Sequence, residues 1–244
     1  MTILQDSAGQ ALALVARGDP VLLSIVGRSL AVSGVACLLA CTAGLVLGAA
    51  LGVARFRGRG ALVTVLNTLL AVPSVVVGLL VYLLLSRSGP LGFLGWLFSF
   101  QAMVVAQALL VLPVCMALTR QVVEDAELAS GEQLRSLGAR GTLRSLLLAW
   151  DERYALLTVL IACFGRAISE VGAVMIVGGN IEGFTRVMTT AIALETSKGD
   201  LPLALALGLV LLAVVLLLNA SIALLRSWRD ARADRLPAVQ VAAA

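Results

Sequence analysis

Long apolar stretches, separated by short polar segments, run through the whole chain of 244 residues. A helix needs about 20 mostly apolar residues to cross the hydrocarbon core of a bilayer. Five stretches reach or approach this length, at residues 22–54, 61–85, 102–118, 155–177 and 201–225. Because no water is present to bind exposed backbone groups in lipid, each stretch should be helical. The pattern therefore predicts an all-α integral membrane protein with about five spans.

The composition agrees with a membrane location. Hydrophobic residues make up 60% of the chain and charged residues only 13%, whereas charged residues make up about a quarter of a typical soluble domain. The formal net charge of +4 does not indicate nucleic-acid binding, because the arginines lie between apolar runs and not on one aromatic-studded face. No internal repeat divides the chain. We therefore predict a single transmembrane domain at residues 22–225.

The basic residues are distributed unevenly along the chain. Twelve of the eighteen lie in three places: the loop after the first apolar stretch, the polar connection at residues 120–153, and the tail at residues 226–244. The positive-inside rule places such segments in the cytoplasm. We therefore predict an inner-membrane protein with a cytoplasmic C-terminal tail and a periplasmic or interfacial N-terminal segment at residues 1–21.

The residue types needed for several kinds of catalysis are missing. The chain has no histidine, which excludes a Ser-His-Asp triad and the zinc-protease signatures. The single lysine, Lys198, precedes Gly199, so there is no phosphate-binding loop that ends in Lys-Ser or Lys-Thr. We predict no catalytic residue and no ATPase site in this chain.

The four cysteines all lie within apolar stretches. They are Cys37, Cys41, Cys115 and Cys163. The first two are four residues apart and would share a helix face, which could hint at a metal site, but the chain has no histidine to complete one. We interpret the cysteines as packing residues and predict no metal and no bound cofactor.

The polar connection at residues 120–153 is the first candidate site. Its leucines recur at helical spacing in a charged background, and Gly138 predicts a turn or a helix end within it. Such an amphipathic helix beneath the bilayer could dock into a groove on another protein. It could equally be an ordinary helix that rests on the lipid headgroups. The periodicity favours neither interpretation.

The fourth apolar stretch carries two charges, Arg166 and Glu170, four residues apart on one helix face. Charges within a span are costly, so they usually pair or face a protein interior or a water path. They could therefore form an ion pair that holds neighbouring helices, or they could line a transport pathway. A stripe of small residues on the same helix permits close helix approach, within the chain or across a dimer axis. The stripe consists of Ala162, Gly165, Ser169 and Gly172.

The polar, glycine-rich segment that follows is a second candidate for a pathway. Glycine backbone amides and hydroxyl groups can solvate an oxyanion without a deeply buried charge. The groups available are Gly178, Gly179, Asn180, Thr185 and Arg186. The alternative is a loop that only connects two spans.

Part of the polar connection resembles a known motif. Five residues match the Glu-Ala-Ala-Arg-x-Leu-Gly-Ala loop of ABC importer permeases, and Gln133 and Leu134 stand where that family has two alanines. The matching residues are Glu132, Arg135, Leu137, Gly138 and Ala139. The resemblance implies that this loop is the coupling helix that docks into the ATPase subunit.

Further segments are similar to the oxyanion branch of the same family. Residues 166–173 match its Arg-Ala-x-x-Glu-x-Gly-Ala sequence, and residues 70–79, 177–186 and 189–200 resemble tungstate permeases in particular. Because an acidic group is a poor lining for an anion, we favour the ion-pair interpretation of Arg166 and Glu170. The same family also transports molybdate and sulfate, and these substrates remain alternatives.

The resemblance implies a complete architecture. We expect a type I ABC importer transmembrane domain that forms a homodimer. Two cytoplasmic ATPase subunits would bind ATP and Mg²⁺, and a periplasmic or lipid-anchored binding protein would deliver the oxyanion. A secondary transporter or channel is the alternative from another class, but no inverted repeat or pair of broken helices is visible in the sequence.

Overall fold

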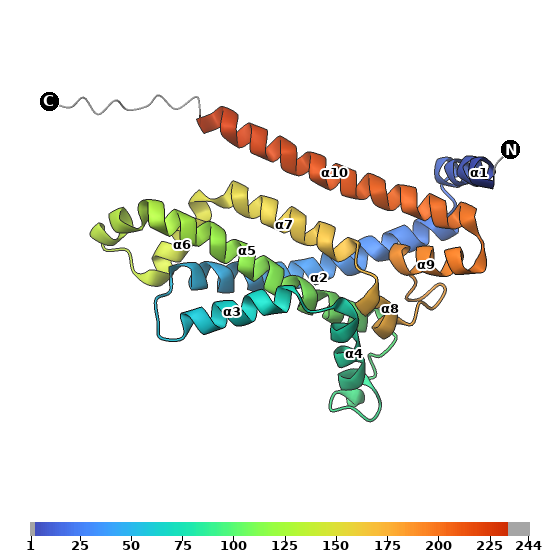
Figure 1. Cartoon of the computed structure of the whole chain (residues 1–244), viewed down its shortest axis with the longest axis horizontal. Helices are drawn as coiled ribbons and strands as arrows, with labels where there is room; N and C mark the ends of the chain where they lie inside the picture. Colours follow the sequence, from blue (N-terminus) through green and yellow to red (C-terminus); the bar gives the residue numbers. More distant parts are fainter. Residues whose placement is uncertain (1–2, 234–244) are drawn as a thin grey trace.

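A computed structural model describes residues 3–233, and the regular elements within this range are all helical (Figure 1). In chain order they are α1 (Ile3–Arg17), α2 (Pro20–Val53), α3 (Arg59–Leu70), α4 (Ser74–Leu85), the 3₁₀ helix η1 (Gly92–Leu94), α5 (Phe100–Ser136), α6 (Gly141–Asp151), α7 (Arg153–Ile168), α8 (Gly172–Gly178), α9 (Met188–Lys198) and α10 (Leu201–Ala233). Residues 1, 2 and 234–244 lie outside the described range, and with them the end of the predicted tail, including Arg235.

The long helices α2, α5, α7 and α10 run along the long axis of the molecule (Figure 1). By length and composition, α2, α5 and residues 201–225 of α10 are each sufficient to cross a membrane. Two bent helix pairs, α3 with α4 and α7 with α8, raise the number to five if each pair forms one span. This range agrees with the predicted all-α membrane protein of about five spans.

The two bent pairs differ from the single spans that the apolar pattern predicts at residues 61–85 and 155–177. Between α3 and α4 the chain turns by 97°, and between α7 and α8 it turns by 55°. Pro73 explains the first break, because proline lacks an N–H group and disfavours helical geometry in the residue before it. Pro113, by contrast, lies inside α5, which continues past it.

Helix α5 is much longer than the apolar stretch at residues 102–118 that predicts it. It continues as one helix to Ser136, so the first half of the polar connection extends the spanning helix. Val123 is fully buried one turn beyond the apolar part and packs with Ala49 and Val53 of α2. This packing gives the extension an apolar face to bury, which supports a long helix better than propensity alone does.

Glycines spaced four residues apart let α2 and α5 approach closely. A Cβ atom on Gly44 would lie 2.7 Å from Cys115 Cβ, and one on Gly48 would lie 2.6 Å from the Met116 carbonyl oxygen. Gly52 continues the row, with its nearest neighbour 3.0 Å away. Small residues at this spacing are a common means of close helix packing in membranes.

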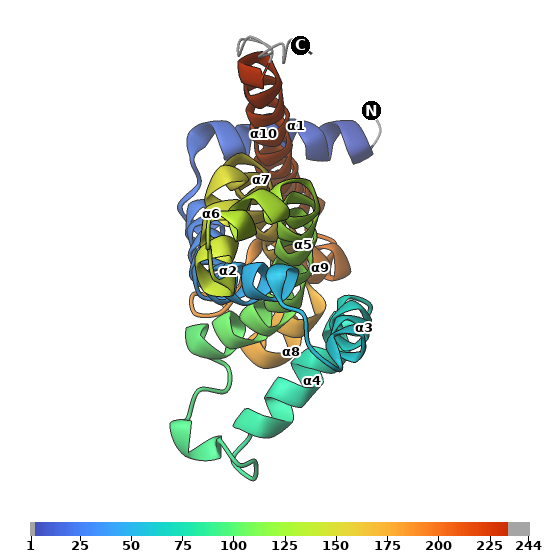
Figure 2. The ribbon, with the colours of Figure 1, turned by 90° about the vertical axis from the view of Figure 1, so that its left-hand side faces the viewer.

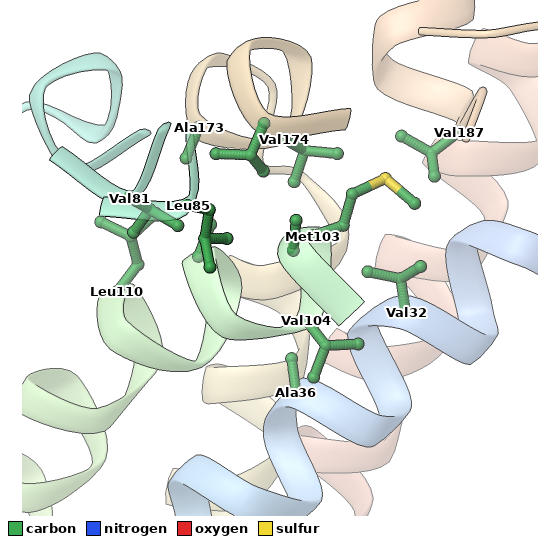
Figure 3. Close-up of a cluster of buried hydrophobic side chains, with 13 residues drawn as sticks. Val32, Ala36, Val81, Leu85, Met103, Val104, Leu110, Ala173, Val174 and Val187 are labelled. Atoms are coloured by element: carbon green, nitrogen blue, oxygen red, sulfur yellow. The ribbon is translucent and has the colours of Figure 1, made fainter. Parts of the chain in front are cut away.

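The main apolar cluster lies where four helices, α2, α4, α5 and α8, converge. In Figure 3, Val32 of α2, Met103 of α5 and Val174 of α8 lie in this cluster, and all three are buried. Among the described residues, the predicted small-residue stripe on α7 has no comparably tight contact at Gly165, whose nearest neighbour is 3.9 Å from an added Cβ.

The two ends of the bundle differ in character. Helix α1 lies across the bundle, roughly perpendicular to α10, and packs against it at the end that holds α9 (Figures 1 and 2). At the opposite end lie the α2–α3 loop, the α5–α6 turn and the C-terminal end of α10 (Figure 1). These are the three arginine-rich segments, so the predicted cytoplasmic groups gather at one end.

Candidate functional site

The turn between α5 and α6, called the elbow below, covers residues 132–141 and includes all five residues of the predicted coupling motif. Gly138 has φ of +79°, and its N–H donates to the Arg135 carbonyl oxygen at 2.9 Å. The N–H of Ala139 donates to the Leu134 carbonyl oxygen at 3.0 Å. These bonds close the last turn of α5, as is typical of a glycine-terminated helix. The predicted helix end at Gly138 is therefore confirmed.

Large apolar side chains are exposed around the elbow. Leu137 is 83% exposed, and Leu146 and Trp150 of α6 are both more than half exposed, whereas Leu148 on the opposite face of α6 is buried. A cluster of exposed apolar groups in a polar connection fits a protein contact better than free solvent. The geometry is compatible with the predicted docking role.

A buried carboxylate fixes the elbow to the end of α5. The side chain of Glu127 is 1% exposed; it accepts a hydrogen bond from Arg135 Nη2 at 2.6 Å and one from Arg144 Nε at 2.9 Å. Arg144 belongs to α6, so the carboxylate joins the two helices across the turn. Arg135, which the motif assigns to docking, is thus also part of the elbow's internal support.

Gly131 makes room for this carboxylate. A Cβ atom added at Gly131 would lie 2.6 Å from Glu127 Cδ and 2.9 Å from each carboxylate oxygen. Glu127 and Gly131 are one helical turn apart on α5, so the side chain lies flat against the helix where a larger residue would displace it. Neither residue is singled out by the sequence, because nothing in the local pattern shows that Glu127 is buried.

A second carboxylate connects the first polar loop to α5. Glu124 pairs with Arg59 at 2.9 Å, with Arg55 at 3.9 Å and with Arg120 one turn before it. Burial alone would raise the pKa of Glu124, which lies beyond the apolar part of α5. The hydrogen bond from Arg59 and the positive charges of Arg59, Arg120 and Arg55 outweigh burial and hold this pKa below its ordinary value.

Arg166 and Glu170 are brought together as an ion pair. Arg166 Nη1 donates to Glu170 Oε2 at 2.8 Å, and the Glu170 side chain is 4% exposed. The other oxygen, Oε1, accepts from the N–H of Ala173 at 3.2 Å in the first turn of α8. The pair therefore lies at the break between α7 and α8 and supports the start of the second helix, which matches the structural interpretation.

The surroundings of the pair are polar but tightly packed. Thr189 Oγ1 donates to the Glu170 carbonyl oxygen at 2.7 Å, and Gln107 Nε2 donates to the Ala167 carbonyl oxygen at 3.0 Å. The two small hollows beside Gln107 and Glu170 have no room for a water molecule.

We expect the pair to be coupled in mutagenesis. Arg166→Ala or Glu170→Ala alone should reduce the amount of protein in the membrane, because each leaves a charge without its partner within a membrane-spanning segment. The double variant should be closer to the wild type than the worse single variant. Quantitative immunoblotting of membrane fractions measures all three, and losses that simply add would contradict the coupling.

The glycine-rich loop after α8 uses most of its polar groups internally. Thr185 Oγ1 donates to the Gly178 carbonyl oxygen at 2.5 Å and accepts from the N–H of Ile181 at 2.9 Å. Asn180, with φ of +50°, donates to the Thr190 carbonyl oxygen at 3.2 Å. Gly179 is also in the left-handed region, with φ of +68°. These bonds define the shape of the loop, and the predicted role in an anion pathway stays a prediction.

Arg186, at the end of this loop, is largely buried and surrounded by acidic groups. Its Nη1 atom lies 3.5 Å from Glu195 and 3.6 Å from Glu182. Arg28 of α2 donates to the Gly183 and Arg186 carbonyl oxygens at 2.7 and 3.3 Å. Nε of Arg186 and Oδ1 of Asn180 are buried without a hydrogen-bond partner among the described residues.

Three of the four cysteines, which the sequence presents as separate packing residues, converge in space. The sulfur atoms of Cys41, Cys115 and Cys163 all lie within 4.8 Å of one another. The residues lie on three different helices, far apart in the chain, so spacing rules for metal ligands could not reveal them.

The chain has extensive similarity to characterised transport proteins. It is 44% identical over 223 residues to the tungstate uptake system permease protein TupB of Peptoclostridium acidaminophilum. The aligned region covers 91% of this chain and 97% of the relative. This chain belongs to the family of oxyanion ABC transporter permeases. The resemblance that the motifs indicate is therefore confirmed. The permease is a multi-pass membrane protein with up to five candidate spans.

Other relatives extend the similarity. The permease is 43% identical over 204 residues to a probable anion ABC transporter permease protein of Haloferax volcanii, which covers 82% of this chain and 88% of the relative. It is 31% identical over 181 residues to the sulfate transport system permease protein CysT of Salmonella typhimurium, which covers 71% and 65% respectively. No protein-family model matches the chain.

Proposed function

We propose that the permease is the membrane-spanning subunit of an ATP-driven importer for tungstate. The observation that carries this proposal is the 44% identity, over nearly the whole chain, to a tungstate uptake permease. A second tungstate permease, from Campylobacter jejuni, is 36% identical over 214 residues. Because selectivity would lie mainly in the partner that captures the anion, sulfate is kept as the second candidate on the strength of the sulfate permease relatives.

The proposed assembly is a type I importer with two copies of this chain. Two ATPase subunits, which themselves bind ATP and Mg²⁺, dock at the cytoplasmic elbows. A periplasmic or lipid-anchored binding protein delivers the oxyanion on the other side. ATP-driven closure of the ATPase dimer moves the elbows, and the spans alternate between outward-facing and inward-facing states. The permease itself makes no covalent change to its substrate. It couples ATP hydrolysis by the ATPase to movement of the oxyanion across the membrane.

The rigid elbow supports this mechanism. A docking element can transmit force only if it moves together with the spanning helix behind it. Here α5 runs without interruption from the apolar region to the elbow, and Glu127 joins its end to α6 through Arg135 and Arg144. A displacement at the elbow would therefore reach the core of the bundle through one continuous helix.

Uptake measurements test the proposed substrate. Cells that lack tungstate uptake should regain it when the permease is expressed with its cognate ATPase and binding protein. Uptake of labelled tungstate should resist a large excess of sulfate and should need all three components. If excess sulfate abolishes tungstate uptake while labelled sulfate enters readily, the chain is a sulfate permease. Uptake without any ATPase would indicate a secondary transporter or channel instead.

The arginine-rich end of the bundle supports a topology with the C-terminus in the cytoplasm and the N-terminus outside. A reporter that fluoresces only in the cytoplasm should be active when fused after Leu225, and a reporter active only in the periplasm should be silent there. The reverse pattern would overturn the topology. A matched fusion in the α9–α10 turn, at Asp200, should show the opposite pair of results because that turn lies at the other end of the bundle.

A further inference from the structure

Three thiol groups form a cluster inside the bundle. Cys41 of α2, Cys115 of α5 and Cys163 of α7 place their sulfur atoms within 4.8 Å of one another. Cys115 and Cys163 are fully buried and Cys41 is 5% exposed. None of these cysteines forms a disulfide. Three separate helices thus present one soft ligand each to a common point.

The close approach of α2 and α5 creates this point. A side chain at Gly44 would lie 2.9 Å from the sulfur of Cys115, so the glycine leaves room for the thiol between the helices. The cluster packs against apolar residues, including Val111 of α5 and Val159 of α7, and the hydroxyl oxygen of Thr119 lies 3.9 Å from the sulfur of Cys115. The thiols are therefore the ligands that an ion would meet in this part of the core.

The spacing of the sulfur atoms suits one bound ion. Thiolate sulfurs bond to metals at about 2.3 Å, so three of them lie about 4 Å apart around a planar centre and roughly 3.4 Å apart around a pyramidal one such as trivalent arsenic. The three sulfur atoms lie within 4.8 Å of one another, so inward rotation of the cysteine side chains would bring them to a common ion. No fourth side-chain ligand of the His, Asp or Glu type joins the cluster among the described residues, which favours ions that accept three-fold coordination.

The apolar surroundings select for the charge of the ion. A net charge inside a membrane bundle is costly. Three thiolates around a monovalent or divalent cation keep a net negative charge, whereas three thiolates around a trivalent centre are neutral. We propose that Cys41, Cys115 and Cys163 form a binding site for a trivalent thiophilic element, with arsenite as the probe ligand.

The binding reaction balances without an oxidant or reductant. Arsenous acid, As(OH)₃, is uncharged near neutral pH. Its three As–O bonds break and three As–S bonds form, and each thiol proton leaves with a hydroxyl group as water. Arsenic remains in the trivalent state throughout. Because no charge is created, the apolar interior does not oppose the exchange.

A hollow reaches one member of the cluster, Cys41. It has a volume of about 310 Å³, lies between α2 and α7, and is lined by Cys41, Leu45 and Leu160 among others. Cys37 also lines this hollow but is not one of the three clustered residues. A small neutral molecule could therefore reach Cys41 first and then exchange its remaining hydroxyl groups with Cys115 and Cys163.

The test uses the purified full-length permease in detergent with a phosphine reductant and arsenite. X-ray absorption at the arsenic edge should show three sulfur neighbours and no oxygen neighbour, at one arsenic per chain. This measurement on the wild type does not depend on the folding of any variant. Fewer than three sulfur neighbours, or retained oxygen, would overturn the proposal.

Two variants separate the cluster from general thiol reactivity. Cys115→Ser should weaken arsenite binding by at least about tenfold and reduce the sulfur count. Cys37→Ser is the matched control, because Cys37 lies in the same hollow outside the cluster, and it should bind as the wild type does. Arsenite should also raise the thermal unfolding temperature of the wild type but not of Cys115→Ser. An equal loss of arsenite binding in both variants, or no loss in Cys115→Ser, would contradict the proposed site.

Discussion

Replacing Gly138 with aspartate is expected to abolish uptake while the permease still inserts into the membrane. Gly138 has φ of +79°, which non-glycine residues adopt at a cost of about 1 kcal/mol. An added Cβ would meet no atom within 4 Å, so the substitution produces no clash within the chain. The new side chain would instead project from the elbow, where the proposed ATPase contact lies. A bulky negative group there should prevent docking.

Co-purification of the ATPase with tagged permease measures this effect, together with uptake of labelled tungstate. We expect wild-type amounts of Gly138→Asp in the membrane, with ATPase binding and uptake both close to background. Glu132→Ala, in the same motif, should have a smaller effect. Full ATPase binding with full uptake in Gly138→Asp would show that the elbow is an ordinary surface turn that does not contact the ATPase.

Gly95→Asp is the matched control. Gly95 also has positive φ, at +63°, and an added Cβ there likewise meets nothing within 4 Å. The variant therefore introduces the same charge and a comparable backbone strain far from the elbow. If Gly95→Asp lost ATPase binding as Gly138→Asp does, strain or charge in general would explain the result, and the contact at the elbow would not.

The apolar pattern predicts the fold class well because lipid allows few alternatives. A stretch such as residues 201–225 must form a helix in the bilayer, whatever its neighbours are. The breaks at residues 71–73 and 169–171 are harder to predict. Pro73 gives a signal for the first, but Pro113 gives the same signal inside an uninterrupted helix. The difference depends on the helices packed around each proline, which a single sequence does not reveal.

The candidate functional residues divide in the same way, into those visible in the local sequence and those that depend on packing between distant segments. The coupling motif and the Arg166–Glu170 pair are local patterns and can be read directly from the sequence. Glu127 and the cysteine cluster depend on contacts between segments that are far apart. A charged residue such as Glu127, in a polar connection, normally predicts an exposed side chain, yet here it is buried where the end of α5 meets α6. Only the three-dimensional arrangement reveals such residues.

Replacing Gly131 with alanine is expected to destabilise the elbow, although alanine is the better helix former by up to about 1 kcal/mol. The new methyl group would occupy the space of the Glu127 carboxylate, whose carbon lies only 2.6 Å from where the Cβ of an alanine would stand. The flexible glutamate would move away and lose its bonds to Arg135 and Arg144. Loss of a buried ion pair costs about 3 kcal/mol, toward the lower limit here because Arg135 is half exposed.

A double-mutant cycle makes this prediction specific. In a Glu127→Ala background the clash no longer exists, so Gly131→Ala should be neutral or slightly stabilising there. Thermal unfolding of the detergent-purified permease gives the stabilities of the wild type, the two single variants and the double variant. The amount of co-purified ATPase reports on the elbow itself. Gly141→Ala is the matched control, because an added Cβ at Gly141, on the other side of the elbow, meets nothing within 4 Å. Equal destabilisation by Gly131→Ala in both backgrounds would show that the glycine acts independently of Glu127. The expected change of sign would show that the small residue is needed because it leaves room for the carboxylate that holds α5 and α6 together.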